Sequence, residues 1–157
     1  MSDLEVTTEN GIATFTMNRP DARNALSMDM RRQLAEALHD AELDDKIRCI
    51  VLKGAGDHFM AGGDIKGMGE SIKKSPEEIK KEFILRIHDL HPIMFAMRRM
   101  PKPIIASCRG AAAGAGVSIA LACDLVIAAE DAFFTLAYCK IGTSPDGSSS
   151  FHLPRAV

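Results

Sequence analysis

The hydrophobic and polar positions of the first part of the chain predict a β-hairpin followed by an amphipathic helix. Residues 4–8 and 12–18 are β-prone runs on either side of Asn10-Gly11, and Asn-Gly between such runs is the strongest short hairpin signal. Ser27 is a suitable N-cap for a helix that ends at about Leu43. Its apolar residues recur at helical spacing, at Met30, Leu34, Ala37, Leu38 and Ala41.

The middle of the chain predicts a strand, a glycine-rich loop and a long helix. Residues 49–52 form a short apolar run typical of a buried strand, and glycines recur between positions 54 and 69. Ser75 and Glu78 form a capping box, with Pro76 at the first helical position. Apolar residues follow at Ile79, Phe83, Ile87, Leu90, Met94 and Met97, and we expect Pro92 to kink or restart this helix.

The last part of the chain predicts three further strands and two helices. The strands are expected at residues 104–107, 125–128 and 133–136, and the helices at 114–122 and from Ser148 onward, after a loop at 142–145. Strands that alternate with helices at this spacing predict an α/β fold. The pattern contains no linker or repeat, so we expect one domain, residues 1–157. Because no Gly or Asn stop signal stands near Val157, we also expect the native chain to continue.

Composition excludes several classes of protein. Nineteen Lys and Arg residues against 21 Asp and Glu residues give a net charge of −2, which argues against a nucleic-acid partner. The longest uncharged run, residues 110–123, is shorter than the ~20 residues that cross a bilayer, so no membrane partner is expected. The cysteines lack CxxC spacing and stand in apolar stretches, which predicts buried, reduced thiols and a cytoplasmic location; they are Cys49, Cys108, Cys123 and Cys139.

Three segments carry candidate chemistry. In residues 60–66, tandem glycines allow a backbone N–H to approach a substrate oxygen, with a plain turn as the alternative. Residues 110–118 follow a strand and open a helix, where free N–H groups can bind an oxyanion; close packing of small side chains is the alternative. The third segment, residues 138–148, contains the only tyrosine, Tyr138. It also contains Asp146, for which spacing alone favours a simple N-cap role.

The histidines and basic clusters give weaker signals. His88 and His91 are three residues apart on one expected helix face, but no third ligand stands at a metal-like spacing, so no metal site is expected. Lysines and arginines gather at residues 73–81 and 98–102. Such clusters are typical of solvated helix faces, and they can also meet a polyanionic ligand.

Taken together and in order, these segments resemble the crotonase family, also called the enoyl-CoA hydratase/isomerase superfamily. The resemblance runs from about Ile12 to Val157 and is carried by Asn18-Arg19-Pro20, Asn24-Ala25-Leu26, and residues 61–66, 101–106, 110–118, 122–125, 142–147 and 153–155. It implies a spiral of repeated strand–strand–helix units and an acyl-CoA substrate, with no cofactor other than the CoA of that substrate. It also implies homotrimers or dimers of trimers. Family members carry a further C-terminal helical segment, which this crotonase-like core lacks.

The resemblance also implies the positions of the site residues. It places the thioester carbonyl between the backbone N–H groups of Gly63 and Ala115, which would stabilise an enolate. It brings Arg23 close to the nucleotide part of CoA, and Lys66 can act likewise. The residues expected to contact the CoA thioester are Arg23, Ala25, Ala61, Gly63, Asp64, Ile65, Lys66, Ala115 and Tyr138.

Departures from the hydratase branch bear on the reaction. That branch has glutamates at the positions of Ser118 and Tyr138, so hydration by two carboxylates is disfavoured here. Asp146 matches the single carboxylate of the isomerase branches, and our leading hypothesis is an enoyl-CoA isomerase with Asp146 as the acid/base that shifts a double bond. In one alternative, resembling the 4-chlorobenzoyl-CoA dehalogenase branch or an acyl-CoA hydrolase, Asp146 attacks the substrate and His91 activates water. A hydratase or lyase using another route, and a non-catalytic CoA-thioester binder, also remain open.

Overall fold

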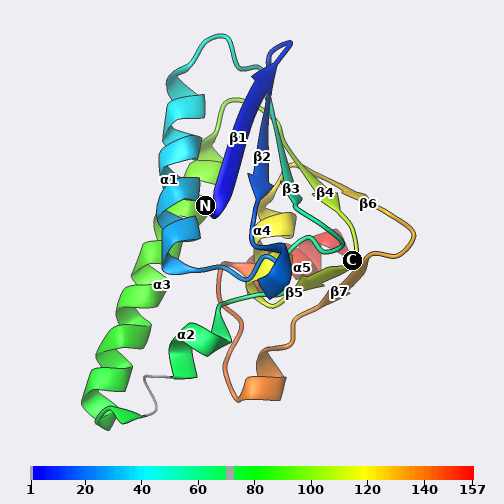
Figure 1. The fold of residues 1–157 in the computed structure, drawn as a ribbon. Coiled ribbons are helices and arrows are strands. Elements are labelled where there is room, and N and C mark those ends of the chain that lie inside the picture. The colour runs from blue at the N-terminus through cyan, green and yellow to red at the C-terminus, as the bar shows by residue number, and fades with distance from the viewer. Residues whose placement is uncertain (1, 70–72) are drawn as a thin grey trace.

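The fold is a succession of strands and helices, seen here in a computed structural model that describes residues 2–69 and 73–157 (Figure 1). The strands are β1 (Leu4–Glu9), β2 (Ile12–Met17), β3 (Cys49–Gly54), β4 (Ile104–Cys108), β5 (Ala111–Ala113), β6 (Leu125–Ala128) and β7 (Phe133–Thr135). The α-helices are α1 (Met28–Leu43), α2 (Ile65–Gly69), α3 (Pro76–Arg99), α4 (Ala115–Ala122) and α5 (Ser149–Ala156). Short 3₁₀ helices are η1 (Pro20–Ala22) and η3 (Tyr138–Ile141).

The strands form two sheets. The larger has the order β1-β2-β3-β4-β6, in which β1 and β2 are antiparallel and the remaining pairs are parallel. The expected hairpin is confirmed: Asn10 and Gly11 both have positive φ, 52° and 83°, as a tight two-residue hairpin loop requires. The smaller sheet pairs β5 with β7 in parallel. Units of two strands and one helix, such as β1-β2-α1 and β4-β5-α4, recur along the chain and confirm the α/β spiral.

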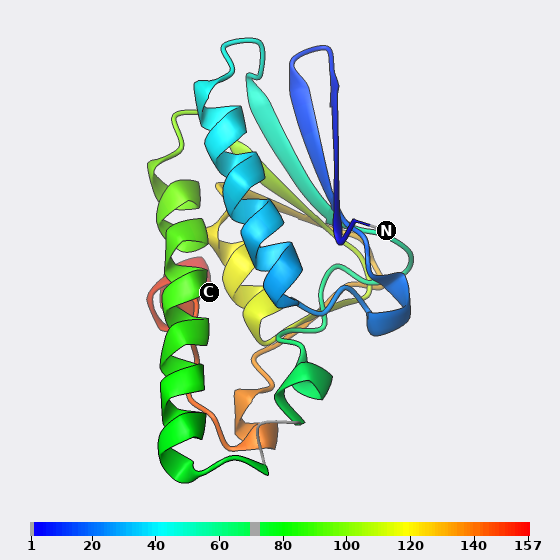
Figure 2. The same ribbon diagram turned by 60° about the vertical axis from the view of Figure 1, so that its left-hand side comes forward.

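The core lies between the larger sheet and the helices that cover one of its faces. Figure 2 shows α1, α3 and α4 on this same side. Alternate residues of the central strands point to the helices and are buried, namely Ala13, Phe15, Met17, Ile50, Leu52, Ile104, Ala106 and Cys108. They meet apolar residues of α1 and α3, among them Met30, Leu34, Leu38, Leu90, Ile93 and Met97.

Both expected helix starts are confirmed. The Ser27 side chain accepts a hydrogen bond from the Met30 nitrogen at 3.0 Å and caps α1. At α3, Ser75 and Glu78 form the full capping box. The expected interruption at Pro92 is wrong in one respect, because α3 continues through this proline to Arg99 instead of restarting. Although Pro92 cannot donate to a carbonyl of the preceding turn, the helix buries apolar residues on both sides of it, and this packing holds it together.

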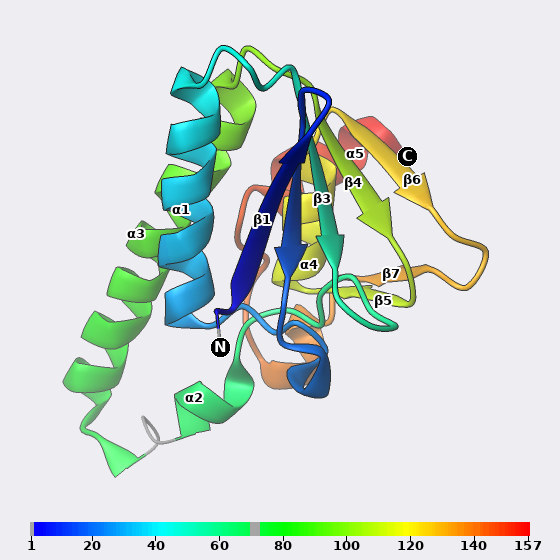
Figure 3. The same ribbon diagram turned by 45° about the horizontal axis from the view of Figure 1, so that its top comes forward.

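Sequence patterns missed four short elements, namely η1, α2, β5 and η3. The all-alanine strand β5 has low β-propensity, but it is fixed by pairing with β7 and by a bridge between Met60 and Ala112. Helix α2 lies in the glycine-rich segment expected to be a loop, and the 3₁₀ helices η1 and η3 lie where no element was expected. Figure 3 shows the small sheet beside the C-terminal ends of β3 and β4, with α2 and η3 on the same side of the molecule. The loops that follow the central strands therefore gather at this end.

The cysteines only partly match the expectation of four buried thiols. Cys108 and Cys123 are buried, Cys49 is half-buried and Cys139 is exposed. Burial raises the pKa of Cys108 to about 11. The predicted burial of Cys139 is wrong. This residue belongs to η3, an element that the apolar residues around it did not predict. Within residues 2–69 and 73–157, no helix has the length and hydrophobicity to cross a membrane.

Candidate functional site

A cavity of ≈ 640 Å³ lies at the end of the molecule where the strand loops gather. Its wall combines segments that are distant in the sequence: residues 61–63 and 65, the N-terminal end of α4, the N-terminal half of α3, and residues 136–146. Figure 2 shows that α3 extends beyond α1 at this end of the molecule, where α2 and η3 also lie. Mostly small and apolar side chains line the cavity, with a few charged groups among them.

Two glycine-containing loops meet at this cavity. Gly62 has a φ of 104°, and a Cβ at this position would lie 3.1 Å from the Ala113 oxygen and 3.8 Å from the Ala115 nitrogen. Only glycine allows such a backbone conformation and such a close approach. The loop is held to the start of α1, because the Leu26 nitrogen donates to the Gly62 oxygen at 2.8 Å. Residues 62–63 and 114–115 are thus fixed side by side.

The backbone N–H groups of Gly63 and Ala115 are both available for a ligand. Among the described residues, neither group has a hydrogen-bond acceptor. Ala115 is the first residue of α4, where N–H groups have no partner within the helix and the helix dipole favours negative charge. Both residues line the cavity. This arrangement can stabilise an oxygen that gains negative charge.

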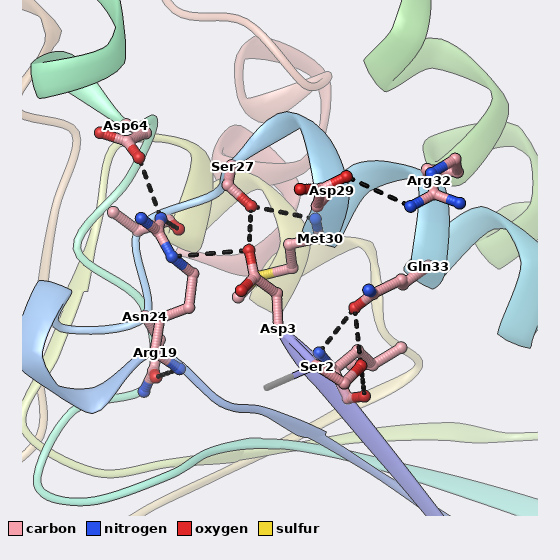
Figure 4. A network of polar contacts seen from close by, with 12 residues as sticks. Ser2, Asp3, Arg19, Asn24, Ser27, Asp29, Met30, Arg32, Gln33 and Asp64 are labelled. Carbon is pink, nitrogen blue, oxygen red and sulfur yellow. Dashed lines mark hydrogen bonds and ion pairs between the residues drawn. The ribbon is translucent and has the colours of Figure 1, made fainter.

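A polar network behind the cavity holds the Gly62–Gly63 loop in place (Figure 4). Arg19 contacts the Asp64 carboxylate at 3.0 Å and donates to the Ala25 oxygen at 2.7 Å. It also lies 3.5 Å from the Asp3 carboxylate, which accepts a hydrogen bond from Ser27. The network therefore ties the loop that carries Gly63 to β1 and to the start of α1.

Asn24 joins the same network from a fully buried position. Its side-chain oxygen accepts from the Arg19 nitrogen at 2.9 Å. Its amide nitrogen donates to the backbone oxygens of Ala55 and His58 at 2.9 and 2.7 Å. Because these acceptors belong to the loop after β3, Asn24 fixes that loop against the one after β2. The sequence resemblance included Asn24 and Arg19 but indicated no structural role for them.

Asp146 lines the cavity and is held by two other polar side chains. The Tyr138 hydroxyl donates to Asp146 Oδ1 at 2.6 Å. The Ser118 hydroxyl donates to the Asp146 backbone oxygen at 2.9 Å and lies 3.1 Å from the Tyr138 oxygen. The interpretation of Asp146 as a helix N-cap is wrong, since Ser148 occupies that position before α5. The Asp146 carboxylate instead accepts from the Tyr138 hydroxyl, and the Asp146 backbone oxygen accepts from the Ser149 nitrogen at the start of α5.

Tyr138 serves as a hydrogen-bond donor in this group. Its pKa is raised from 10 to about 12, chiefly by burial and also by the hydrogen bond to Asp146, while the hydrogen bond with Ser118 acts in the opposite direction. The phenol therefore stays protonated near neutral pH and does not act as a base. Of the side chains that line the cavity in the described part of the chain, Asp146 is the only carboxylate.

Close packing explains why a small residue stands at position 118. Ser118 is fully buried on α4, and a Cβ added at Gly147 would lie only 2.7 Å from the Ser118 Cβ. Gly147 also has a φ of 56°, which disfavours other residues. The backbone beside Asp146 therefore packs directly on Ser118, and this space does not admit a glutamate.

Arg31 is a cavity residue that sequence patterns did not reveal. It stands on α1 next to Met30, is only 5% exposed, and lines the cavity. Burial lowers the pKa of this guanidinium, and the negative charge of Asp146 partly offsets the shift. The available signal was weak: position 31 lies three residues before Leu34, at the border of the apolar stripe of α1, where an arginine usually reaches solvent.

The structure brings together some of the expected ligand-contacting residues but not all of them. Those that line the cavity are Ala61, Gly63, Ile65, Ala115, Tyr138 and Asp146. Four others lie outside its wall, namely Arg23, Ala25, Asp64 and Lys66. Arg23 and Lys66 are exposed, and the Arg23 oxygen accepts a hydrogen bond from the Ala61 nitrogen at 2.9 Å.

His91 does not line the cavity. It is exposed on α3, where its ring centroid lies 6.0 Å from those of His88 and Phe95. The two histidines therefore share a helix face, as their spacing predicts. In the part of the chain that the structure describes, no group of three His, Cys, Asp or Glu side chains could hold a metal ion.

Comparison with known proteins gives a consistent family relationship. The family model described as enoyl-CoA hydratase/isomerase matches residues 7–157. The chain is 39% identical to the 1,2-epoxyphenylacetyl-CoA isomerase of Escherichia coli (strain K12), over 95% of this chain and 56% of that protein. It is 38% identical to the 4-chlorobenzoyl coenzyme A dehalogenase-2 of an Arthrobacter species, over 99% of this chain and 56% of that protein.

Solved structures show the same fold. An enoyl-CoA hydratase from Polaromonas sp. JS666 superimposes with a TM-score of 0.88 and 39% sequence identity. The match covers 98% of this chain and 58% of the solved chain. This chain thus spans just over half the length of the proteins that it matches. Their names include an isomerase, a dehalogenase and a hydratase, so similarity alone leaves the reaction open.

Proposed function

The chain belongs to the enoyl-CoA hydratase/isomerase family, and we propose that its cavity binds the acyl part of a CoA thioester and that Asp146 shifts a double bond in it. The observation that carries this proposal is the single carboxylate of the cavity, held beside two free backbone N–H groups. A double-bond shift needs one group that removes a proton at one carbon and returns it at another. Addition of water by two carboxylates finds no counterpart among the described cavity residues.

The N–H groups of Gly63 and Ala115 would receive the thioester oxygen. Removal of a proton next to the thioester, or one double bond further along, places negative charge on this oxygen. Two fixed donors oriented toward it would each lower the barrier by roughly 3 kcal/mol. The closeness of residues 62–63 to 114–115 supports this role.

The two carboxylate oxygens of Asp146 would have different roles. Oδ1 accepts the Tyr138 hydrogen bond at 2.6 Å, whereas Oδ2 has no hydrogen bond from the described residues and would take the substrate proton. The Tyr138 hydrogen bond would hold the carboxylate in place while Oδ2 removes the proton and later returns it.

The remaining expected contacts concern the CoA moiety outside the cavity. Arg23 and Lys66 are exposed cations beside the cavity wall, since the Arg23 oxygen accepts from the Ala61 nitrogen and Lys66 follows Ile65. They would meet the phosphate groups of CoA. Asp64 and Ala25 would act indirectly, because both bind Arg19 behind the loop that carries Gly63. Homotrimers or dimers of trimers and a cytoplasmic location stay predictions.

The dehalogenase-like or hydrolytic alternative is less well supported. The similarity to the Arthrobacter dehalogenase and the presence of Asp146 favour it. That route also needs a histidine that activates water, and His91 is exposed and outside the cavity wall. Release of free CoA or halide from a thioester would nevertheless identify it.

The proposal is tested by isomerisation of an enoyl-CoA in deuterium oxide. We expect interconversion of the 2- and 3-enoyl isomers and deuterium uptake at the α or γ carbon without net addition of water. Asp146→Asn should lower this rate by roughly 10²- to 10⁴-fold while thioester binding persists. Asp131→Asn, a change at an exposed loop position, is the matched control and should keep the rate. Full exchange activity in Asp146→Asn would refute the role of Asp146.

A further inference from the structure

Arg31 is a buried cation for which the described residues provide no ion-pair partner. Its Nη1 donates to the backbone oxygen of Arg86, but its Nε has no hydrogen-bond partner. No carboxylate lies within ion-pair distance of it in residues 2–69 and 73–157, and Asp146 and Asp89 act on it only from further away. A buried charge without a partner is costly, and proteins normally pair such groups.

The other charges of the cavity leave this cation uncompensated. Arg31, Arg86 and Lys140 line the wall, against Asp146 as the carboxylate. Arg86 contacts Glu82 at 3.3 Å, so its charge has a counter-ion within α3. Lys140 is exposed at the rim, where solvent stabilises it. Arg31 is therefore the cavity cation that lacks a counter-ion among the described residues, and an anionic ligand would supply one.

We propose that Arg31 binds a carboxylate at the end of the acyl group remote from the thioester, so that the substrates are CoA thioesters of dicarboxylic acids. This inference rests on the proposed function and specifies its substrate class. The planar guanidinium group matches the two oxygens of a carboxylate. An apolar acyl chain would instead displace water from the cavity and leave the guanidinium without a counter-ion.

A purely structural role for Arg31 accounts for less of the geometry. The hydrogen bond to the Arg86 oxygen joins α1 to α3, but a single such contact does not need a charged group. Its position on the cavity wall, near enough to Asp146 to sense its charge, places the guanidinium where the acyl group would lie beyond the reacting carbons. The cation would also offset repulsion between the substrate carboxylate and Asp146.

The test compares pairs of saturated thioesters of equal length, which bind without reacting. Succinyl-, glutaryl- and adipyl-CoA are titrated into the protein by isothermal calorimetry beside butyryl-, valeryl- and hexanoyl-CoA. At the best-fitting length, the carboxylate thioester should bind roughly 10- to 100-fold more tightly than its methyl-ended partner, as expected for charge-assisted hydrogen bonds. This comparison uses the unmodified protein, so it does not depend on whether a variant folds.

Variants then assign the preference to its residue. Arg31→Gln should abolish the preference, so that the carboxylate-ended and methyl-ended thioesters of each pair bind with equal affinity. Arg32→Gln is the matched control, because the neighbouring side chain is 62% exposed and contacts only surface carboxylates. Equal binding of both partners at every length, or a preference that persists in Arg31→Gln, would overturn the role of Arg31 alone. If no CoA thioester binds, the proposed function itself fails as well.

Discussion

Replacement of Asp146 by asparagine should lower the pKa of Tyr138. In the native protein this pKa is raised from 10 to about 12, with burial as the largest cause and the hydrogen bond to Asp146 as the next. Asparagine keeps a similar shape and still offers an oxygen, but it carries no negative charge to oppose ionisation of the phenol. We therefore expect the pKa of Tyr138 to fall in Asp146→Asn and to stay above its ordinary value, because burial is unchanged.

The size of the effect follows from the shift itself. A difference of about two pKa units corresponds to about 3 kcal/mol between the protonation states. Because the folded pKa lies above the unfolded one, Tyr138 contributes this stability fully below pH 10, and the contribution is lost as the pH rises towards 12. In Asp146→Asn the folded pKa of Tyr138 should lie closer to the unfolded one. The stability lost on ionisation should therefore be smaller, and it should be lost over a narrower pH range.

The assay is direct because the chain contains one tyrosine and no tryptophan. The ultraviolet absorbance of tyrosinate, followed during an alkaline titration, therefore reports Tyr138 alone. Circular dichroism recorded in parallel shows over which pH range the protein remains folded. Asp131→Asn again serves as the control, since Asp131 is exposed and lies outside the cavity wall.

Two outcomes would refute the reasoning. If Tyr138 titrates at its ordinary value in the folded native protein, the phenol is not buried against Asp146. If its pKa is raised but is the same in Asp146→Asn, the contact between the two side chains has no electrostatic consequence. In either case the picture of Asp146 as a base held by a neutral phenol would have to be abandoned.

Two further changes test the parts that surround the carboxylate. Gly62→Ala places a Cβ 3.1 Å from the Ala113 oxygen at a φ of 104°. Thermal unfolding should therefore show a free energy of unfolding that is lower by roughly 1–3 kcal/mol. Stability equal to that of the native protein would contradict the close approach of the two loops. Arg19→Lys keeps the charge but removes the fork that joins Asp3 to Asp64, so kcat for isomerisation should fall by more than KM changes. An unchanged kcat would show that the network does not position the loop.

Structural features that depend on residues close together in the chain were predicted well from the sequence. The Asn10-Gly11 turn, the Ser27 cap and the Ser75 capping box each depend on residues that are close together in the chain, and all three are present. Strand β5 was missed because its alanines favour a strand only once β7 lies beside them. Residue patterns therefore defined the main elements but not the short ones that tertiary pairing creates.

The candidate site divides in the same way. The glycine-rich segments and Asp146 stood out by composition and by resemblance, and the structure brings them to one cavity. The hydrogen bond that Tyr138 donates to Asp146, and the burial of Arg31, depend on how α1 and η3 pack around that cavity. No spacing rule relates positions 31, 138 and 146. Their proximity had to come from coordinates.

The contact between Asp3 and Arg19 has a practical consequence for handling the protein. Through Arg19, the loop that carries Gly63 is braced by Asp3, a residue that precedes β1. A deletion of Asp3, or a tag that displaces it, would therefore act on turnover from a distance, through the carboxylate that Arg19 and Ser27 share. Variants of the segment before β1 deserve an activity measurement even where their melting temperature is unchanged.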